Sequence, residues 1–197
     1  DGGWPTFCRG WGHLPFDRSS ADISAHALRA LAAWKKDFQS SSFATAGEMG
    51  AYTRRTEGAI KRGLRFLGRE QRSDGAWIPL WFGAQHAPED ENPTYGTTRV
   101  LTAYRTLNLI ETEAARRGLH WLIRAQGYDG GWGGAPQTPS SVEETALAVD
   151  ALLGCGEVAG SKETLERGIR WLVERVEDGG FVDASPIGFY FAKLWYF

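Results

Sequence analysis

Three side chains are candidates for proton chemistry: Asp22, His26 and Tyr95. Asp22 and His26 are four residues apart in a stretch with helical periodicity, so their carboxyl and imidazole groups share one helix face. Tyr95 lies at the start of a later helical stretch. Each residue also has an ordinary interpretation: a helix histidine satisfied by a neighbour, an N-terminal carboxylate favoured by the helix dipole, and a packing tyrosine. The residue types alone leave both interpretations open.

Other chemistries fit the sequence less well. The four histidines form neither an HxxxH nor an HxxE arrangement, which argues against a zinc site. Cys8 and Cys155 lack CxxC spacing, so we expect two reduced thiols and no disulfide framework. The run from Gly154 to Glu157 resembles the internal thioester of complement-like domains, but Val158 stands where the cross-linking glutamine would be. No glycine-rich phosphate loop occurs.

Composition narrows the class of protein. The chain has 197 residues and is 42% hydrophobic, which is enough for one domain with a sizeable core. Its 22 basic and 24 acidic residues form no long run of one sign, so a nucleic-acid partner is not expected. Neither a signal peptide nor a run of 18 apolar residues is present, which favours a cytoplasmic protein whose membrane contact is at most peripheral.

The elements that must position the candidate residues belong to an internal repeat. Residues 118–132 read GLHWLIRAQGYDGGW, residues 63–77 read GLRFLGREQRSDGAW, and residues 168–181 read GIRWLVERVEDGGF. Each copy has a helical apolar pattern, then a glycine-rich stop that ends in an aromatic residue. Such spacing is typical of stacked helical units. The chain opens on the stop of a further copy and ends inside a helical pattern, so we expect it to be cut at both ends.

The pattern predicts an all-α chain, with residues 1–197 forming a single segment. Residues 37–56 lack periodicity and are predicted to be a loop with one helical turn. Ser141 and Glu144 form a predicted capping box at the start of the fifth helix. The seven predicted helices are Ala21 to Trp34, Glu57 to Glu70, Thr97 to Leu107, Thr112 or Glu113 to Gln126, Val142 to Leu153, Ser161 to Glu174, and Ile187 to Phe197.

Two of the stops fit the pattern QxxxGxW, with Gln71, Gly75 and Trp77 in one and Gln126, Gly130 and Trp132 in the other. In helical hairpins this spacing resembles the QW repeats of the squalene-hopene and oxidosqualene cyclases. The resemblance extends to Asp-Ile-Ser-Ala-His at 22–26, Tyr-Gly-Thr at 95–97 and Pro-Ile-Gly-Phe-Tyr-Phe at 186–191. It implies an α/α toroid, with this chain as the C-terminal half of a terpenoid cyclase-like α/α barrel.

The resemblance also implies a function. In that family an aspartic acid protonates a polyene such as squalene, rings close through carbocations, and neither a cofactor nor a metal takes part. Carried over by position, His26, Asp22 and Tyr95 support a catalytic aspartate that would precede residue 1. Trp81, Phe189 and Tyr196 fall near positions that line the family's substrate cavity. Aromatic faces suit that role because they stabilise cations without reacting, by about 0.5 to 2 kcal/mol for each contact.

Three departures keep an alternative open. Lys193 stands where a cavity aromatic is expected, residues 82–93 form an insertion, and the third stop has Arg175 and Phe181 in place of Gln and Trp. The alternative is a non-catalytic repeat module that binds a polyprenoid lipid or a protein partner. Protein prenyltransferase β subunits resemble this fold too, but they need a zinc ligand set that is missing here. The expected partners are a squalene-like polyprenoid and the rest of the barrel, with a homodimer and contact with the inner membrane surface left open.

Overall fold

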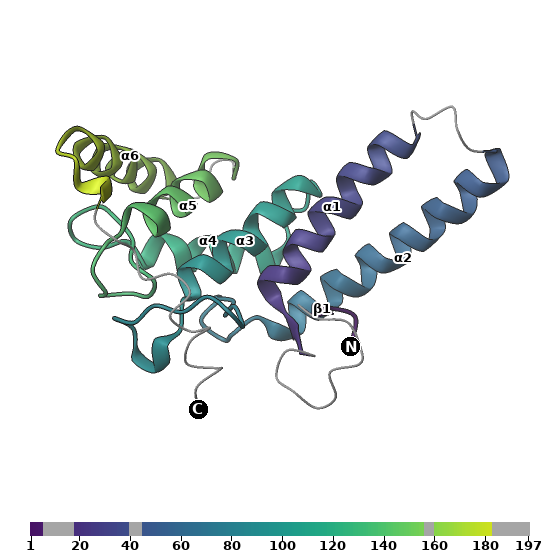
Figure 1. The fold of residues 1–197 in the computed structure, drawn as a ribbon, viewed down its shortest axis with the longest axis horizontal. Coiled ribbons are helices and arrows are strands. Elements are labelled where there is room, and N and C mark those ends of the chain that lie inside the picture. Colours follow the sequence, from purple (N-terminus) through teal and green to yellow (C-terminus); the bar gives the residue numbers. More distant parts are fainter. Residues whose placement is uncertain (6–17, 40–44, 156–159, 183–197) are drawn as a thin grey trace.

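The computed structural model describes residues 1–5, 18–39, 45–155 and 160–182 (Figure 1). These residues form six α-helices, two short 3-10 helices and one two-stranded antiparallel sheet. The strands are β1 (Trp4–Pro5) and β2 (Ser19–Ser20). The helices are α1 (Ala21–Gln39), α2 (Ala46–Glu70), η2 (Pro88–Asp90), α3 (Pro93–Thr106), α4 (Glu113–Arg124), α5 (Val142–Leu153), α6 (Ser161–Glu177) and η3 (Gly180–Val182).

The helices form two layers. Along one layer, α1 packs on α3 and α3 packs on α5. Each of these helices also packs on the helix that follows it, so that α2, α4 and α6 form the second layer (Figure 1). We call α1, α3 and α5 the inner helices and the other three the outer helices. Stacked helical hairpins of this kind are the arrangement expected of part of an α/α toroid, and the predicted fold class is confirmed.

A buried tryptophan joins each of the two QxxxGxW stops to three helices. The Trp77 side chain is fully buried, and its indole Nε1 donates to the carbonyl oxygen of Leu67 in the last turns of α2 at 2.7 Å. Its backbone N–H donates to Thr97 Oγ1 on α3 at 3.0 Å. Its ring lies against Gly118 of α4 so closely that an added Cβ would be 2.6 Å from Cζ3. Trp77 therefore holds two successive outer helices and the inner helix between them.

The next stop repeats this arrangement. Trp132 Nε1 donates to the carbonyl oxygen of Leu122 at 2.8 Å, and its backbone N–H donates to Thr145 Oγ1 at 2.9 Å. Its ring lies against Gly168 of α6. The glycines that begin the sequence repeats are thus the positions against which the preceding tryptophan packs, a role that the sequence does not reveal.

The glutamines of the two QxxxGxW stops bind the neighbouring outer helix. Gln126 Nε2 donates to the carbonyl oxygens of Gly130 and of Thr164, both at 2.8 Å. Gly130 has φ of +97°, a left-handed conformation that favours glycine. Since Thr164 lies in the first turn of α6, this one amide connects the stop to the next repeat. Gln71 makes the same pair of contacts at the preceding stop.

Most of the predicted helices are confirmed, and α5 has the predicted bounds. The predicted loop at residues 37–56 is wrong, because α1 continues to Gln39 and α2 begins at Ala46. Thr45 accepts a hydrogen bond from the Glu48 backbone, and Glu48 bonds back to the Thr45 backbone, so a capping box starts the helix. Phe38 contacts Tyr52 across the hairpin, with ring centroids 4.3 Å apart. The predicted helix Ile187 to Phe197 lies outside the described residues.

We predict that Gly118→Ala lowers stability. The added methyl group would meet the buried Trp77 ring, and such overpacking costs about 1 to 3 kcal/mol, more than the roughly 1 kcal/mol of helix propensity that alanine contributes. Gly68→Ala on α2 is the matched control, because no described atom beyond its chain neighbours and its own helix backbone lies within 4 Å of its Cβ position. Thermal unfolding should show a lower melting temperature for Gly118→Ala and an equal or higher one for Gly68→Ala. Equal melting temperatures would contradict the role of this contact.

We also predict that Gln126→Glu is more damaging than Gln126→Met. Methionine removes two donated hydrogen bonds, whereas glutamate also turns a carboxylate oxygen toward two carbonyl oxygens. The expected cost is about 1 to 3 kcal/mol for methionine and more for glutamate, measured by chemical denaturation. If glutamate were tolerated as well as methionine, the amide would not be the link between repeats.

Candidate active site

The inner helices share one register relative to the stops. On each inner helix, a hydroxyl group in the first two turns accepts the backbone N–H of the tryptophan that precedes it. Ser24 accepts from Trp4 at 2.9 Å, Thr97 from Trp77 at 3.0 Å and Thr145 from Trp132 at 2.9 Å. The three N-terminal ends are therefore at the same level, and positions counted from these hydroxyls are equivalent.

Counting from these hydroxyls brings the candidate residues into one band. The position two residues before the hydroxyl is Asp22 on α1, Tyr95 on α3 and Glu143 on α5. The position two residues after it is His26 on α1, Arg99 on α3 and Leu147 on α5. Within this band the charges of Asp22, Arg99 and Glu143 act on titratable groups of the neighbouring helices. The structure thus places His26, Asp22 and Tyr95 in one band, and their catalytic roles stay predictions. We call this set, with Arg99 and Glu143, the polar cluster.

Asp22 is a buried carboxylate, and only one of its two oxygen atoms has a hydrogen-bond partner among the described residues. Its side chain is inaccessible to solvent, and its Oδ1 accepts a hydrogen bond from Ser20 Oγ at 2.7 Å. Its Oδ2 is also buried and has no partner among the described residues. Asp22 lies in the first turn of α1, where the helix dipole favours a carboxylate, and its burial removes the solvent that would otherwise hydrate it. The free oxygen calls for a donor from outside the described residues, such as water.

His26 is exposed on one side of α1, and no hydrogen bond joins it to Asp22 in the described structure. Partial burial lowers the pKa of His26, and the positive charges of Arg99 and Arg29 lower it further, while Asp22 acts in the opposite direction. The imidazole is therefore neutral at pH 7. A neutral imidazole can donate one hydrogen bond and accept another.

Tyr95 is packed between residues of its own helix and the connection before it. Its ring stacks on Phe82 with centroids 4.3 Å apart, and the guanidinium carbon of Arg99 lies 4.9 Å from the ring centroid. Burial raises the pKa of Tyr95, so its phenol stays protonated and can act as a donor. Burial likewise raises the pKa of Glu143, with a further contribution from the charge of Glu144.

The connection between residues 78 and 92 is fixed in place by Asn92. This side chain is fully buried, accepts the backbone N–H of Tyr95 at 2.9 Å, and donates to Glu144 Oε1 on α5 at 2.9 Å. The predicted cap at Ser141 is confirmed, since its hydroxyl accepts from the Glu144 backbone at 3.1 Å. The Glu144 carboxylate, however, binds Asn92 and the Ser141 hydroxyl, and the Ser141 backbone N–H donates to Trp132. The second half of the capping box is therefore replaced by a link between repeats.

The sequence did not indicate the roles of Asn92 and Arg99, and it indicated Glu144 only as part of a capping box, without its bond to Asn92. Asn92 could have been found, because an asparagine before Pro93 is a typical start of a helix. Of the predicted substrate-binding residues, Trp81 is buried in the connection before α3. Phe189 and Tyr196, like Lys193, lie outside the described residues, so their predicted roles stay predictions.

The structure gives no support to metal or thiol chemistry in the described ranges. Within residues 1–5, 18–39, 45–155 and 160–182, no three His, Cys, Asp or Glu side chains are grouped to hold a metal ion. Cys155 is buried and donates to the carbonyl oxygen of Ala151 at 2.5 Å. Burial raises the pKa of the Cys155 thiol to about 11, so it is a poor nucleophile. None of the described helices is long and apolar enough to cross a membrane.

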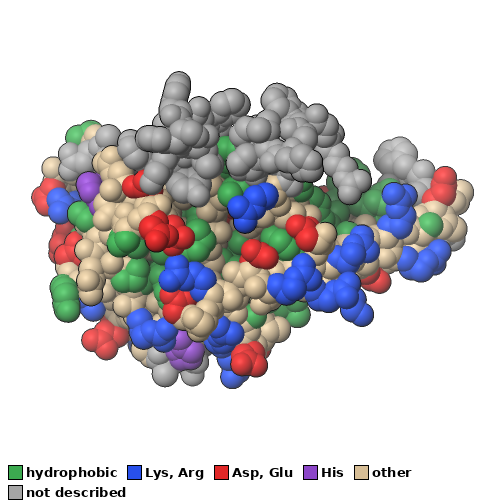
Figure 2. Space-filling view, turned by 90° about the horizontal axis from the view of Figure 1, so that it is seen from below, with side chains coloured by type: hydrophobic (Ala, Val, Ile, Leu, Met, Phe, Trp, Pro, Cys, Tyr) green, Lys and Arg blue, Asp and Glu red, His purple; other side chains and the backbone are tan. Residues whose placement is uncertain are grey.

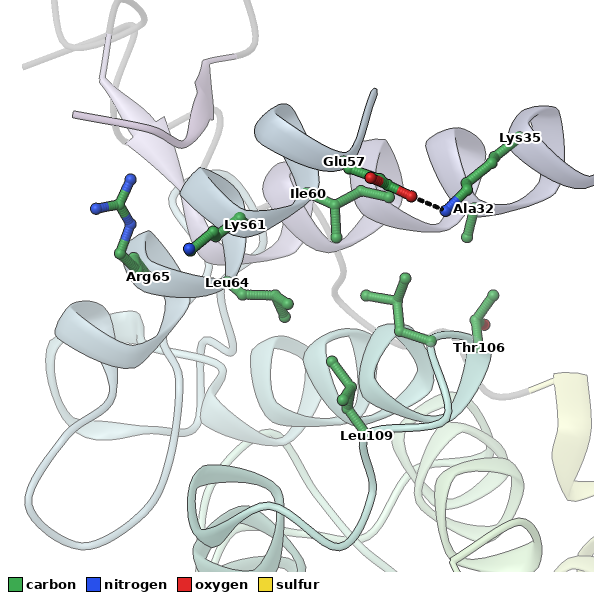
Figure 3. Close-up of a pocket in the computed structure, with 10 residues that line it drawn as sticks. Ala32, Lys35, Glu57, Ile60, Lys61, Leu64, Arg65, Thr106 and Leu109 are labelled. Carbon is green, nitrogen blue, oxygen red and sulfur yellow. Dashed lines mark hydrogen bonds and ion pairs between the residues drawn. The ribbon is translucent and has the colours of Figure 1, made fainter. Parts of the chain in front are cut away.

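A separate groove of about 590 Å³ lies further along α1, between α2 and the C-terminal end of α3 (Figure 3). Ile60, Leu64 and Leu109 supply apolar lining, and Lys35 forms an ion pair with Glu57 at 2.6 Å on its rim. Lys and Arg side chains are also frequent on the surface of this part of the molecule (Figure 2). The groove shares no residue with the polar cluster, and its one carboxylate, Glu57, is already in the ion pair. It is therefore not a second candidate for proton transfer.

Several known proteins are similar to this chain in sequence. The family model described as the squalene-hopene cyclase C-terminal domain matches residues 13–197. A probable squalene-hopene cyclase of Sinorhizobium fredii is 27% identical over 93% of this chain and 28% of its own length. A copalyl diphosphate synthase of Streptomyces cyslabdanicus is 34% identical over 76% of the chain and 24% of its length, and a drimenyl diphosphate synthase of Streptomyces showdoensis is 33% identical over 92% and 29%.

A solved structure agrees with the fold. The ent-copalyl diphosphate synthase from Streptomyces platensis superposes with a TM-score of 0.65 over 88% of this chain and 29% of that chain, at 24% identity. The chain therefore spans less than a third of the length of these relatives. By its fold and by the match of the family model over nearly its whole length, this chain belongs to the squalene-hopene cyclase C-terminal domain family.

Proposed function

We propose that the full-length protein is a terpenoid cyclase that closes rings in a polyene after protonating it. The observation that carries this proposal is the polar cluster, in which a buried carboxylate with a free oxygen, a neutral imidazole and a buried phenol lie at one level near the start of the inner helices. A packing role alone does not explain why these three groups occupy one level. Proton transfer within a largely apolar fold does.

In the proposed reaction a carboxylic acid that precedes this chain gives its proton to a terminal alkene carbon. A new C–H bond forms, and the remaining alkenes attack the resulting cations in turn until a proton is lost or water adds. His26 is proposed to hydrogen-bond the acid and orient it. Asp22 accepts a hydrogen bond through Oδ2, and Tyr95 helps return a proton to the acid through water.

The proposed substrate is squalene or a similar polyprenoid. The names of the two Streptomyces relatives favour a second class, a polyprenyl diphosphate that reacts at the opposite end from its diphosphate. Both classes need the same acid, so the polar cluster serves either one. Peripheral contact with the inner face of the membrane is part of the proposal, because such substrates partition into lipid.

A non-catalytic role is the competing proposal. The same helical repeat could hold an intact polyprenoid lipid or a protein partner. This alternative predicts that the protein binds the lipid without converting it, and that binding does not depend on His26.

We predict that His26→Ala in the full-length protein reduces cyclisation by about 10- to 100-fold, because the acid loses a hydrogen-bond partner. The assay is incubation with squalene and, separately, with a polyprenyl diphosphate, followed by mass spectrometry of the extracted products. His120→Ala is the matched control, since this histidine is exposed on the outer helix α4.

Three outcomes separate the proposals. A cyclic product that is lost in His26→Ala and kept in His120→Ala supports the cyclase. Unchanged turnover in His26→Ala rejects the role of His26. Intact lipid recovered bound to the wild-type protein, with no cyclic product from either substrate, supports the non-catalytic alternative.

A further inference from the structure

Arg99 occupies the position on α3 that His26 occupies on α1. Each lies two residues after the hydroxyl that accepts a stop tryptophan, and α1 packs directly on α3. The guanidinium carbon of Arg99 lies 4.9 Å from the centre of the Tyr95 ring. An imidazole and a guanidinium are therefore presented at the same level by neighbouring inner helices.

The polar cluster has one free donor and one free acceptor. Arg99 Nε is buried and has no hydrogen-bond partner among the described residues, and the same is true of Asp22 Oδ2. Leaving such groups unsatisfied costs about 1 to 3 kcal/mol each, and more when they are charged. The carbonyl oxygen of a protonated carboxylic acid can accept from Arg99, which leaves its hydroxyl free to give its proton to the alkene, and Asp22 Oδ2 can accept from a separate donor such as water.

Two positive charges at this level would repel each other. The charged groups that act on His26 are Asp22 and Arg29 from its own helix and Arg99 from α3, which also carries the uncharged phenol of Tyr95. Partial burial is the largest cause that lowers the pKa of His26, Arg99 and then Arg29 lower it further, and Asp22 raises it. Arg99 stays charged at every pH in which a protein works, so of the two groups it is His26 that gives up its proton.

We propose that Arg99 is a positioning residue that supplies the positive charge of this site, and that His26 acts as a neutral hydrogen-bond partner of the proton donor. This inference rests on the proposed function and adds to it. A fixed cation near a carboxylic acid stabilises the conjugate base and so strengthens the acid. The cyclase would then keep its acid strength at a pH where a histidine has no charge to offer.

The first test is the pH dependence of cyclisation between pH 5 and 9 in the full-length protein. Arg99→Gln should lower the rate at pH 8 by about tenfold or more, since an opposite charge within about 4 to 6 Å shifts a carboxyl pKa by 1 to 3 units. As the pH falls, His26, whose pKa Arg99 no longer lowers, protonates at a higher pH than in the wild type and restores part of the rate. The Arg99→Lys variant keeps the charge and should stay close to the wild type over the whole range.

The double variant Arg99→Gln with His26→Gln should lack the recovery at low pH. A purely structural role for Arg99 would lower the rate by the same factor at every pH and leave the shape of the profile unchanged. That result would overturn the proposal, as would a wild-type rate in Arg99→Gln.

The second test does not need turnover. The His26 signal in the full-length protein, labelled with ¹³C at histidine and assigned with His26→Gln, is titrated by NMR. The pKa of His26 should rise toward its ordinary value near 6.5 in Arg99→Gln, with a smaller rise in the matched control Arg29→Gln. An unchanged pKa in Arg99→Gln would refute the role of Arg99. Absence of cyclisation by the wild-type protein with both substrate classes would instead refute the proposed function.

Discussion

The contact between a stop tryptophan and the glycine of the following outer helix is the constraint on which the rest of the structure depends. Trp77 lies so close to Gly118 that no side chain fits between them, and its indole and backbone N–H groups are both used by the helices on either side. A buried indole without its hydrogen bond would be costly, so ring, glycine and carbonyl must be placed together. The outer helices are thereby spaced by a rigid ring, and each inner helix is fixed along its own axis by one hydroxyl.

This axial fixing has a chemical consequence. Because the hydroxyls of Ser24 and Thr97 bind equivalent backbone groups, α1 and α3 cannot slide relative to each other without breaking a buried hydrogen bond. The side chains before and after these hydroxyls are then held at one level, where the charges of Asp22 and Arg99 act on His26. Precise positioning is what proton transfer requires, since the donor and its partners must be within hydrogen-bond reach. The hydroxyl contacts that hold the repeats together therefore also position the side chains of the polar cluster.

The sequence predicted features that depend on local patterns better than features that depend on contacts between helices. Helices with strong periodicity and a clear cap, such as Val142–Leu153, were predicted to the residue, and the pair Asp22 and His26 was found because its spacing is local. The first half of α2 was missed because small residues hide its apolar face, and its stability comes from a cap at Thr45 and from packing on α1. Arg99 was missed for a different reason: its importance depends on a neighbour 73 positions away, which only the packing of α3 on α1 reveals.

The third inner helix, α5, shows which kind of side chain the fold accepts at the position equivalent to His26 and Arg99. On α5 the position equivalent to His26 and Arg99 is Leu147, while the hydroxyl of Thr145 keeps the same bond to the stop as in the other repeats. The fold therefore accepts an apolar side chain there, and packing gives no reason for an imidazole or a guanidinium at the other two. Polar groups buried with free hydrogen-bonding atoms, such as Asp22 Oδ2 and Arg99 Nε, lower the stability of a domain that could do without them. Such unpartnered buried atoms lie on two adjacent inner helices, whereas α5 adds Glu143 to the polar cluster but, among the described residues, no unpartnered buried side-chain atom; a proton-transfer site confined to one side of the toroid would produce this pattern.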